Sequence, residues 1–157
     1  MKQDKFLTGI LIGIGALIVL ALALFFTRQD NRDYVSDSTP EGVVHNYVLA
    51  VLNKDYEKAY GYLADLDNKP TEEEFRQSFL NGMVHPENVG VEISDVETIG
   101  NDATVHLLIY YSYNDPFSSR YGSPDRANLV KQNSEWKLSY MPYNFWDYAW
   151  YQEPYNP

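Results

Sequence analysis

The sequence has no cysteine and few basic residues, and each shortage excludes some functions. Without cysteine there is no disulfide framework, cysteine metal site, thiol nucleophile or cysteine-linked lipid anchor. The 157 residues contain 12 Lys plus Arg against 22 Asp plus Glu, so the formal net charge is −10. This charge opposes binding to nucleic acid or to acidic lipid surfaces, because both attract basic proteins. The length suits one folded domain.

Metal-binding and catalytic patterns are scarce as well. The three histidines, His45, His85 and His106, show neither an HxxxH motif nor a cluster with aspartate at ligand spacing. We therefore expect no metal ion and no cofactor. The aspartates of ADLDN, residues 64–68, read as helix-end and turn residues. We assign no catalytic residue.

Charge is absent from one long stretch, the 21 residues from Phe6 to Phe26. A helix of that length is about 31 Å long, close to the thickness of a membrane's hydrocarbon core. The stretch therefore predicts an uncleaved transmembrane anchor over residues 6–27. The alternative is a signal peptide cleaved near residues 21–23, but the run is longer than signal peptides need. Gly9 and Gly13 form a GxxxG motif that predicts close packing of two such helices.

The charges beside this run predict its orientation. Lys2 and Lys5 precede it, which places residues 1–5 in the cytoplasm by the positive-inside rule. The rest of the chain would then lie outside a bacterial cell membrane. Residues 28–39 are polar and without periodicity, and they predict a flexible linker.

Three helices are expected next. Thr39-Pro40 is a helix start, and apolar residues at spacings of three and four continue to about Leu52. Asp55 can cap a second, short helix. Thr71 and Glu74 have the spacing of a capping box, which predicts the start of a third.

Strands follow, because the apolar period changes to two. Residues 89–99 form one strand or two, and residues 103–113 form a long strand. Both faces of that long strand are apolar, so it should be central in the sheet and covered on each side. Residues 114–126 read as a loop, and residues 127–131 and 135–140 as a hairpin.

The part of the chain that follows the linker also resembles a known superfamily. The segment TPEGVVHNYVLAVLNKDYEKAYGYLAD, a capped helix, an antiparallel meander and a closing EWKL strand together resemble the nuclear transport factor 2-like (NTF2-like) superfamily. In particular they look like the small NTF2-like domains that bacteria carry behind a membrane anchor. The match covers residues 40–140 and implies an α+β cone, in which a bent sheet wraps the first helix and leaves a pocket at the open end. It also implies pairing through the outer sheet face, as is frequent in the superfamily.

The implied pocket suggests candidate ligand contacts. Some members of the superfamily are isomerases or dehydratases, which need an acidic base opposite an oxyanion donor. Nothing in this sequence assembles such a site, so we expect the pocket at most to bind a small apolar or sugar-like ligand. The candidate pocket residues are Tyr47, Tyr60, His106, Tyr110 and Trp136.

The tail, residues 141–157, is rich in aromatic residues and proline. Tyrosine and tryptophan are typical of docking surfaces. Residues 144–151 could form a short helix. Packing of the tail into its own domain and contact with a membrane interface are the alternatives. The candidate docking residues are Tyr143, Phe145, Trp146, Tyr148, Trp150 and Tyr151.

Together these observations favour a non-catalytic binding or assembly module that associates with an envelope protein or with itself. The alternative is a protein with a pocket for a small molecule or glycan, and isomerase-type or dehydratase-type chemistry is its enzymatic extreme.

Overall fold

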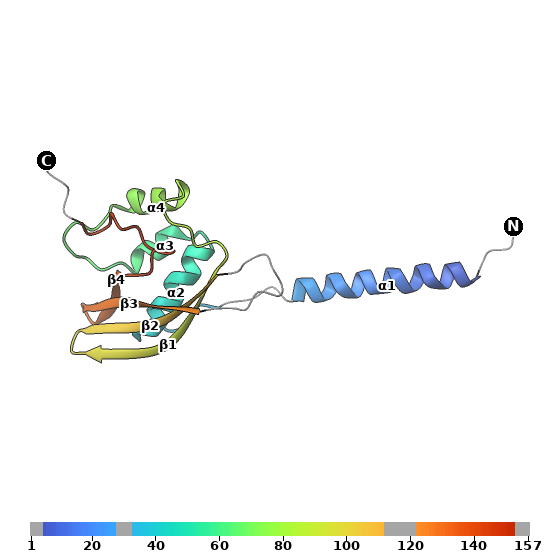
Figure 1. Cartoon of the computed structure of the whole chain (residues 1–157), viewed down its shortest axis with the longest axis horizontal. Helices are drawn as coiled ribbons and strands as arrows, with labels where there is room; N and C mark the ends of the chain where they lie inside the picture. Colours follow the sequence, from blue (N-terminus) through green and yellow to red (C-terminus); the bar gives the residue numbers. More distant parts are fainter. Residues whose placement is uncertain (1–4, 28–32, 112–121, 153–157) are drawn as a thin grey trace. The chain divides into compact units, whose positions relative to one another are not determined.

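The structure is a computed structural model that describes residues 5–27, 33–111 and 122–152 (Figure 1). It divides into two units, Met1–Asp33 and Tyr34–Pro157. Most of the predicted cytoplasmic terminus, the first part of the predicted linker and the end of the predicted tail lie outside the described residues.

The first unit contains helix α1 (Lys5–Thr27). Among the described residues, no helix is long and apolar enough to cross a membrane. The prediction of a transmembrane helix over residues 6–27, which was part of the expected fold class, is therefore wrong.

The second unit begins with three capped helices. In α2 (Pro40–Leu52) the N-cap Thr39 accepts a hydrogen bond from the amide of Gly42, and proline occupies the first turn. In α3 (Tyr56–Gly61) Asp55 is the N-cap. These starts confirm the helices expected from the sequence, because capping side chains pair amides that the helix leaves open.

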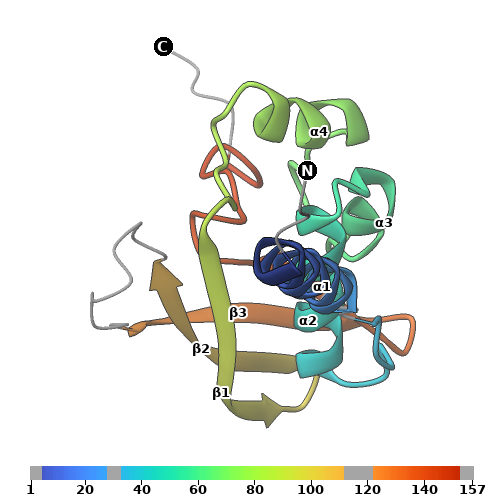
Figure 2. The ribbon, with the colours of Figure 1, turned by 90° about the vertical axis from the view of Figure 1, so that its right-hand side faces the viewer.

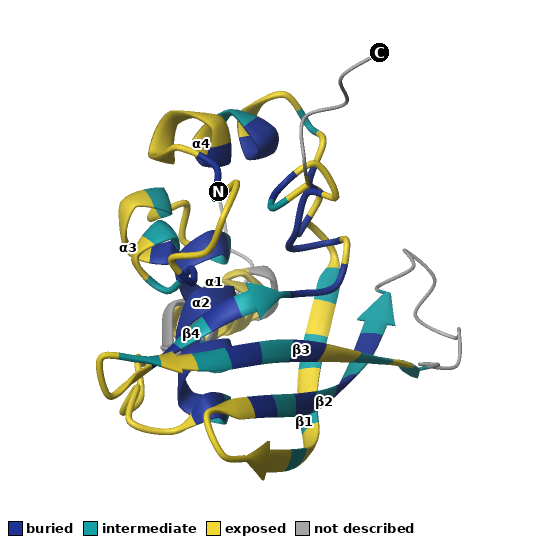
Figure 3. Cartoon of the chain, turned by 90° about the vertical axis from the view of Figure 1, so that its left-hand side faces the viewer, coloured by how far each residue is buried: buried dark blue, intermediate teal, exposed yellow. Residues whose placement is uncertain are grey.

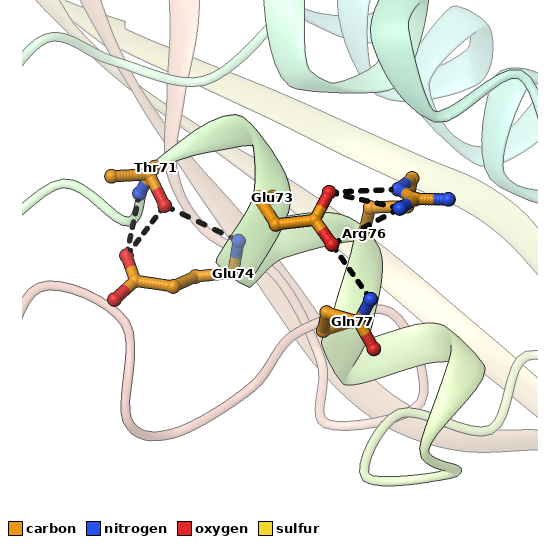
Figure 4. A network of polar contacts seen from close by, with 5 residues as sticks. All are labelled: Thr71, Glu73, Glu74, Arg76 and Gln77. Carbon is orange, nitrogen blue, oxygen red and sulfur yellow. Dashed lines mark hydrogen bonds and ion pairs between the residues drawn. The ribbon is translucent and has the colours of Figure 1, made fainter.

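Helix α4 (Glu72–Leu80) has the complete capping box that was expected (Figure 4). The Thr71 hydroxyl accepts from the amide of Glu74 at 3.3 Å, and the Glu74 carboxylate accepts from the amide of Thr71 at 2.8 Å. One turn further on, the Glu73 carboxylate accepts from Arg76 at 2.9 Å and from Gln77 at 2.7 Å. The start of α4 is therefore fixed by local bonds alone.

An antiparallel sheet follows, with strands in the order β1-β2-β3-β4. The bounds are β1 (Val89–Ile99), β2 (Asp102–Tyr111), β3 (Gly122–Gln132) and β4 (Glu135–Tyr140). Val105 of β2 lies opposite Val96 of β1 and Ala127 of β3. Since β2 pairs on both sides, its predicted central position is confirmed. Residues 89–99, for which one or two strands were expected, form the single strand β1. Its pairing with β2 has an irregularity between Ile93 and Asp95.

Strand β3 starts at Gly122, inside the segment that was predicted as a loop. This part of the strand contains Pro124, and proline cannot donate to a sheet ladder. However, β4 pairs with β3 only from Asn128 onward, so Pro124 has a neighbour on one side only. The missing amide is tolerated at that free edge.

One face of the sheet is covered by helices. Helix α2 packs directly on β1, β2 and β4, α3 packs on α2, and α4 packs on α3 (Figures 2 and 3). The inward residues of β2, Val105, Leu107 and Ile109, are at most 2% exposed. The outward residues of β2 are half-buried, so the expectation that β2 is covered on each side holds for one side only.

The chain then folds back over the helices from Met141 onward. This C-terminal segment, residues 141–152, contains turns and no helix, so the short helix suggested for residues 144–151 does not form. Met141 and Phe145 are fully buried, and the Tyr47 hydroxyl donates to the carbonyl of Phe145 at 2.6 Å. The segment is part of the hydrophobic core (Figure 3).

Candidate binding surfaces

The five predicted pocket residues do not line a common cavity. Tyr47 is fully buried, and this burial raises the pKa of its phenol well above the ordinary value. The Tyr60 hydroxyl donates to the carbonyl of Pro70 at 3.0 Å, and buried Trp136 lies 5.3 Å from the Lys131 ammonium. His106 and Tyr110 lie on β2 with the outward parity, away from these three.

The predicted docking residues divide into buried and exposed groups. Phe145, Trp146 and Trp150 are at most 4% exposed, whereas Tyr143 and Tyr148 are 49% and 65% exposed. Tyr151 is half-buried, its ring stacks on Trp146, and its hydroxyl donates to the carbonyl of Ala64 at 2.6 Å. The described part of the tail thus packs into its own domain, which was the alternative to docking.

Gly9 and Gly13 are exposed on α1, and a Cβ added at either position would meet no atom within 4 Å. The helix packing predicted for them depended on the membrane span that is corrected above.

The outward face of the sheet is one candidate surface. Residues paired across strands share a face, so the register places Thr104, His106, Leu108 and Tyr110 of β2 beside outward residues of β1 and β3. All four of these residues are half-buried. We call this surface the outer face. Its other members are Gly90, Glu92, Asp95 and Glu97 on β1, and Gly122, Pro124, Arg126, Asn128 and Val130 on β3.

The Tyr110 side chain is held in place on this face. A Cβ added at Gly122 would lie 2.8 Å from the Tyr110 ring, so the ring lies directly against the glycine backbone. A hydrogen bond to Glu92 raises the pKa of the Tyr110 phenol, followed by burial as a smaller cause. His106 Nε2 lies 3.6 Å from Glu97 Oε1. The outer face therefore has an ordered aromatic centre with acidic neighbours.

The second candidate surface is a cleft of about 440 Å³ beside α4. One wall comes from the second half of α4 and the residues after it, and another from Asn68, Lys69 and Pro70. The third wall is the C-terminal segment, through Asp147, Ala149, Trp150 and Gln152. Figure 2 shows this segment beside α4. Sequence reasoning missed the cleft, because its walls meet only in the folded chain.

Comparisons with known proteins found matches among solved structures only. No family model matches the chain, and no curated protein sequence matches it. Similar solved structures include a SEC-C motif containing protein from Rhodopseudomonas palustris, with 14% identity, 68% of this chain and 79% of that chain covered, and a TM-score of 0.47. An NTF2-like protein of unknown function from Pseudomonas putida has 16% identity, coverage of 65% and 80%, and a TM-score of 0.44. A cystatin-like fold protein from Nostoc punctiforme has 17% identity, coverage of 61% and 80%, and a TM-score of 0.45.

The order of elements expected from the NTF2-like resemblance is present, because three helices precede a four-stranded antiparallel sheet. Proteins described as NTF2-like are among the structures to which the chain is similar. Identities of this size concern the fold alone and carry nothing about activity, ligand or partner.

Proposed function

We propose that this chain is a non-catalytic binding module that associates with a second copy of itself through the outer face. The proposal rests on the exposure of that face. Helices cover the opposite side, whereas no described element packs on Leu108, Tyr110 or their neighbours. Half-buried apolar side chains in the middle of a sheet are typical of a surface that another molecule covers.

The charges of the outer face favour a second copy as the occupant. Glu92, Asp95 and Glu97 make the β1 side acidic, whereas Arg126 on β3 gives the other side a positive charge. Lys137 on β4 adds no net charge there, because it pairs with Glu135 at 2.9 Å. A two-fold axis parallel to the strands would place the acidic side of one copy over the basic side of the other. An axis across the strands would place like charges together, at a cost in free energy.

The size of the face is consistent with a modest dimer. Four strands about 4.8 Å apart, most of them about 30 Å long, present roughly 500 Å². Stable interfaces cover about 800 Å² of each partner, so association at micromolar concentration is expected rather than an obligate dimer.

The experiment measures the mass of the full-length chain by sedimentation over a range of concentrations. Leu108→Glu puts a charge in the centre of the face, and we expect it to weaken association at least tenfold, because a buried unpaired charge is costly. Leu80→Glu is the matched control, since Leu80 is 56% exposed on α4. A chain that stays monomeric at every concentration, or equal masses for Leu108→Glu and the unmodified chain, would refute the proposal.

Charge reversal tests the orientation of the two copies. Arg126→Glu alone should weaken the dimer, and Arg126→Glu combined with Glu97→Arg should recover part of the loss, because opposite charges then face each other again. An additive effect of the two reversals would exclude the axis parallel to the strands.

A further inference from the structure

The cleft beside α4 is a built cavity, because internal contacts fix its walls. The Ser78 hydroxyl of α4 donates to Asp147 Oδ2 at 2.7 Å, and the amide of Ala149 donates to Asp147 Oδ1 at 2.9 Å. The amide of Tyr151 donates to the carbonyl of Asn68 at 3.1 Å. The first and third of these bonds join the C-terminal wall to the other two, and the second orders the C-terminal wall itself. A volume of about 440 Å³ lies within the range of about 300–1,000 Å³ that is typical of small-molecule sites.

One wall contains a hydrogen-bond donor that lacks an acceptor. Trp150 is 4% exposed and its ring packs on Phe75 at 4.8 Å, yet its indole Nε1 is buried without a partner among the described residues. A buried unpaired N–H is costly, so a small rearrangement is favoured that brings it an acceptor oxygen, either from the chain or from a ligand in the cleft.

The charges around the cleft disfavour an anion. Its carboxylates are those of Glu74 and Asp147, and neither makes an ion pair within the described residues. Lys69 is the cation of the lining, but its ammonium donates to the carbonyl of Leu63 at 3.4 Å and lies 4.7 Å from the Tyr60 ring centre. That ammonium is therefore already engaged, and the lining's two carboxylates outnumber its one cation.

Neutral amides make up most of the remaining polar lining. Asn68, Asn81 and Gln152 line the cleft with amides that can donate and accept, and Gln77, whose Nε2 donates to Glu73, can offer its carbonyl oxygen. Amides and carboxylates arranged in this way suit ligands with several hydroxyl groups. The Trp150 ring already packs against Phe75 at 4.8 Å and against Trp146 at 5.1 Å, so little of the ring is left for a ligand to stack on.

We infer that this cleft is a binding site for an uncharged, hydroxyl-bearing ligand of monosaccharide size. Gln77 on α4 and Asn81, the C-cap of α4, are its hydrogen-bonding contacts on that wall, and the carboxylate of Asp147 excludes anionic analogues. The site shares no residue with the outer face, so it is independent of self-association.

The test titrates the full-length chain carrying Trp136→Phe, which leaves two tryptophans at or beside the cleft, and follows their fluorescence. The probes are glucose, N-acetylglucosamine and glucuronate. We expect saturable binding of at least one neutral sugar, and at least tenfold weaker binding of glucuronate. No saturation with either neutral sugar, or binding of glucuronate as tight as theirs, would overturn the inference.

Two variants separate the site from an indirect effect. Asn81 is exposed, so Asn81→Ala leaves the fold in place and should weaken the neutral sugar about 3- to 10-fold, the worth of one hydrogen bond. Asp147→Asn keeps the shape and can still pair with Ser78, and it should improve glucuronate binding about tenfold. Unchanged binding in both variants would place the sugar elsewhere and refute the site.

Discussion

At the scale of single residues, Tyr47 connects parts of the chain that are far apart in sequence. Its ring lies in α2 and its hydroxyl bonds to the carbonyl of Phe145, 98 positions away. The surrounding side chains include Phe75, whose ring centre is 6.5 Å from that of Tyr47. One phenol therefore holds the C-terminal segment onto the helices.

Tyr47→Phe should lower the free energy of unfolding by about 1–2 kcal/mol, because it leaves the carbonyl of Phe145 buried without its donor. Chemical denaturation followed by circular dichroism measures this change. Tyr143→Phe is the control, since that hydroxyl is on a side chain that is 49% exposed and should change stability by less than about 0.5 kcal/mol. Equal effects of the two variants would show that the buried bond contributes nothing specific.

A residue that sequence reasoning passed over is Asn46. Its amide accepts from the amide of Val35 at 2.9 Å and donates to the carbonyl of Val35 at 2.8 Å, although the side chain is only 2% exposed. A Cβ added at Gly42 would lie 2.0 Å from the carbonyl oxygen of Ser36, so only glycine fits beneath this segment. The residues from Tyr34 onward thus belong to the globular unit. No short sequence motif predicts the contact between Asn46 and Val35.

At the scale of elements, the capping box of α4 carries a separate prediction. Thr71→Ala should destabilise the chain by about 1 kcal/mol, because the amide of Glu74 then loses its acceptor. Thr98→Ala on β1 is the control, as Thr98 is exposed. The measurement is the denaturation midpoint, and a shift for Thr98→Ala as large as that for Thr71→Ala would contradict the capping account.

Elements set by local chemistry were predictable, and those set by distant partners were not. The helix starts at Thr39, Asp55 and Thr71 follow from capping rules, and all three formed. The beginning of β3 depends on pairing with β2, where Gly122 lies opposite Tyr110, and the local sequence does not contain that partner. The cleft was not predictable for the same reason, because its three walls are brought together by tertiary contacts alone.

At the scale of the whole molecule, tyrosines link stability to pH. Burial raises the pKa of Tyr47 and of Tyr151 above the ordinary value. In the unfolded chain these phenols lose their protons near pH 10, while the fold keeps them neutral. The stabilisation is therefore complete below about pH 10 and is lost as pH rises above it.

We expect the free energy of unfolding to be steady around neutral pH and then to fall by about 1.4 kcal/mol per pH unit for each such tyrosine. Denaturation curves between about pH 8 and pH 11 measure the slope. Tyr47→Phe should make the decline shallower, because one linked group is gone. A flat profile through this range would show that both phenols ionise equally well in the folded chain.

The late position of Trp150 has a consequence for synthesis. Phe75 and Phe79 are translated long before the tryptophan that covers them. Until residues 145–150 have left the ribosome, those rings and Met141 have no complete core to enter. Until then the nascent chain carries exposed aromatic surface, which chaperones bind and which promotes aggregation. A chain truncated just before Phe145 would therefore lack a closed core.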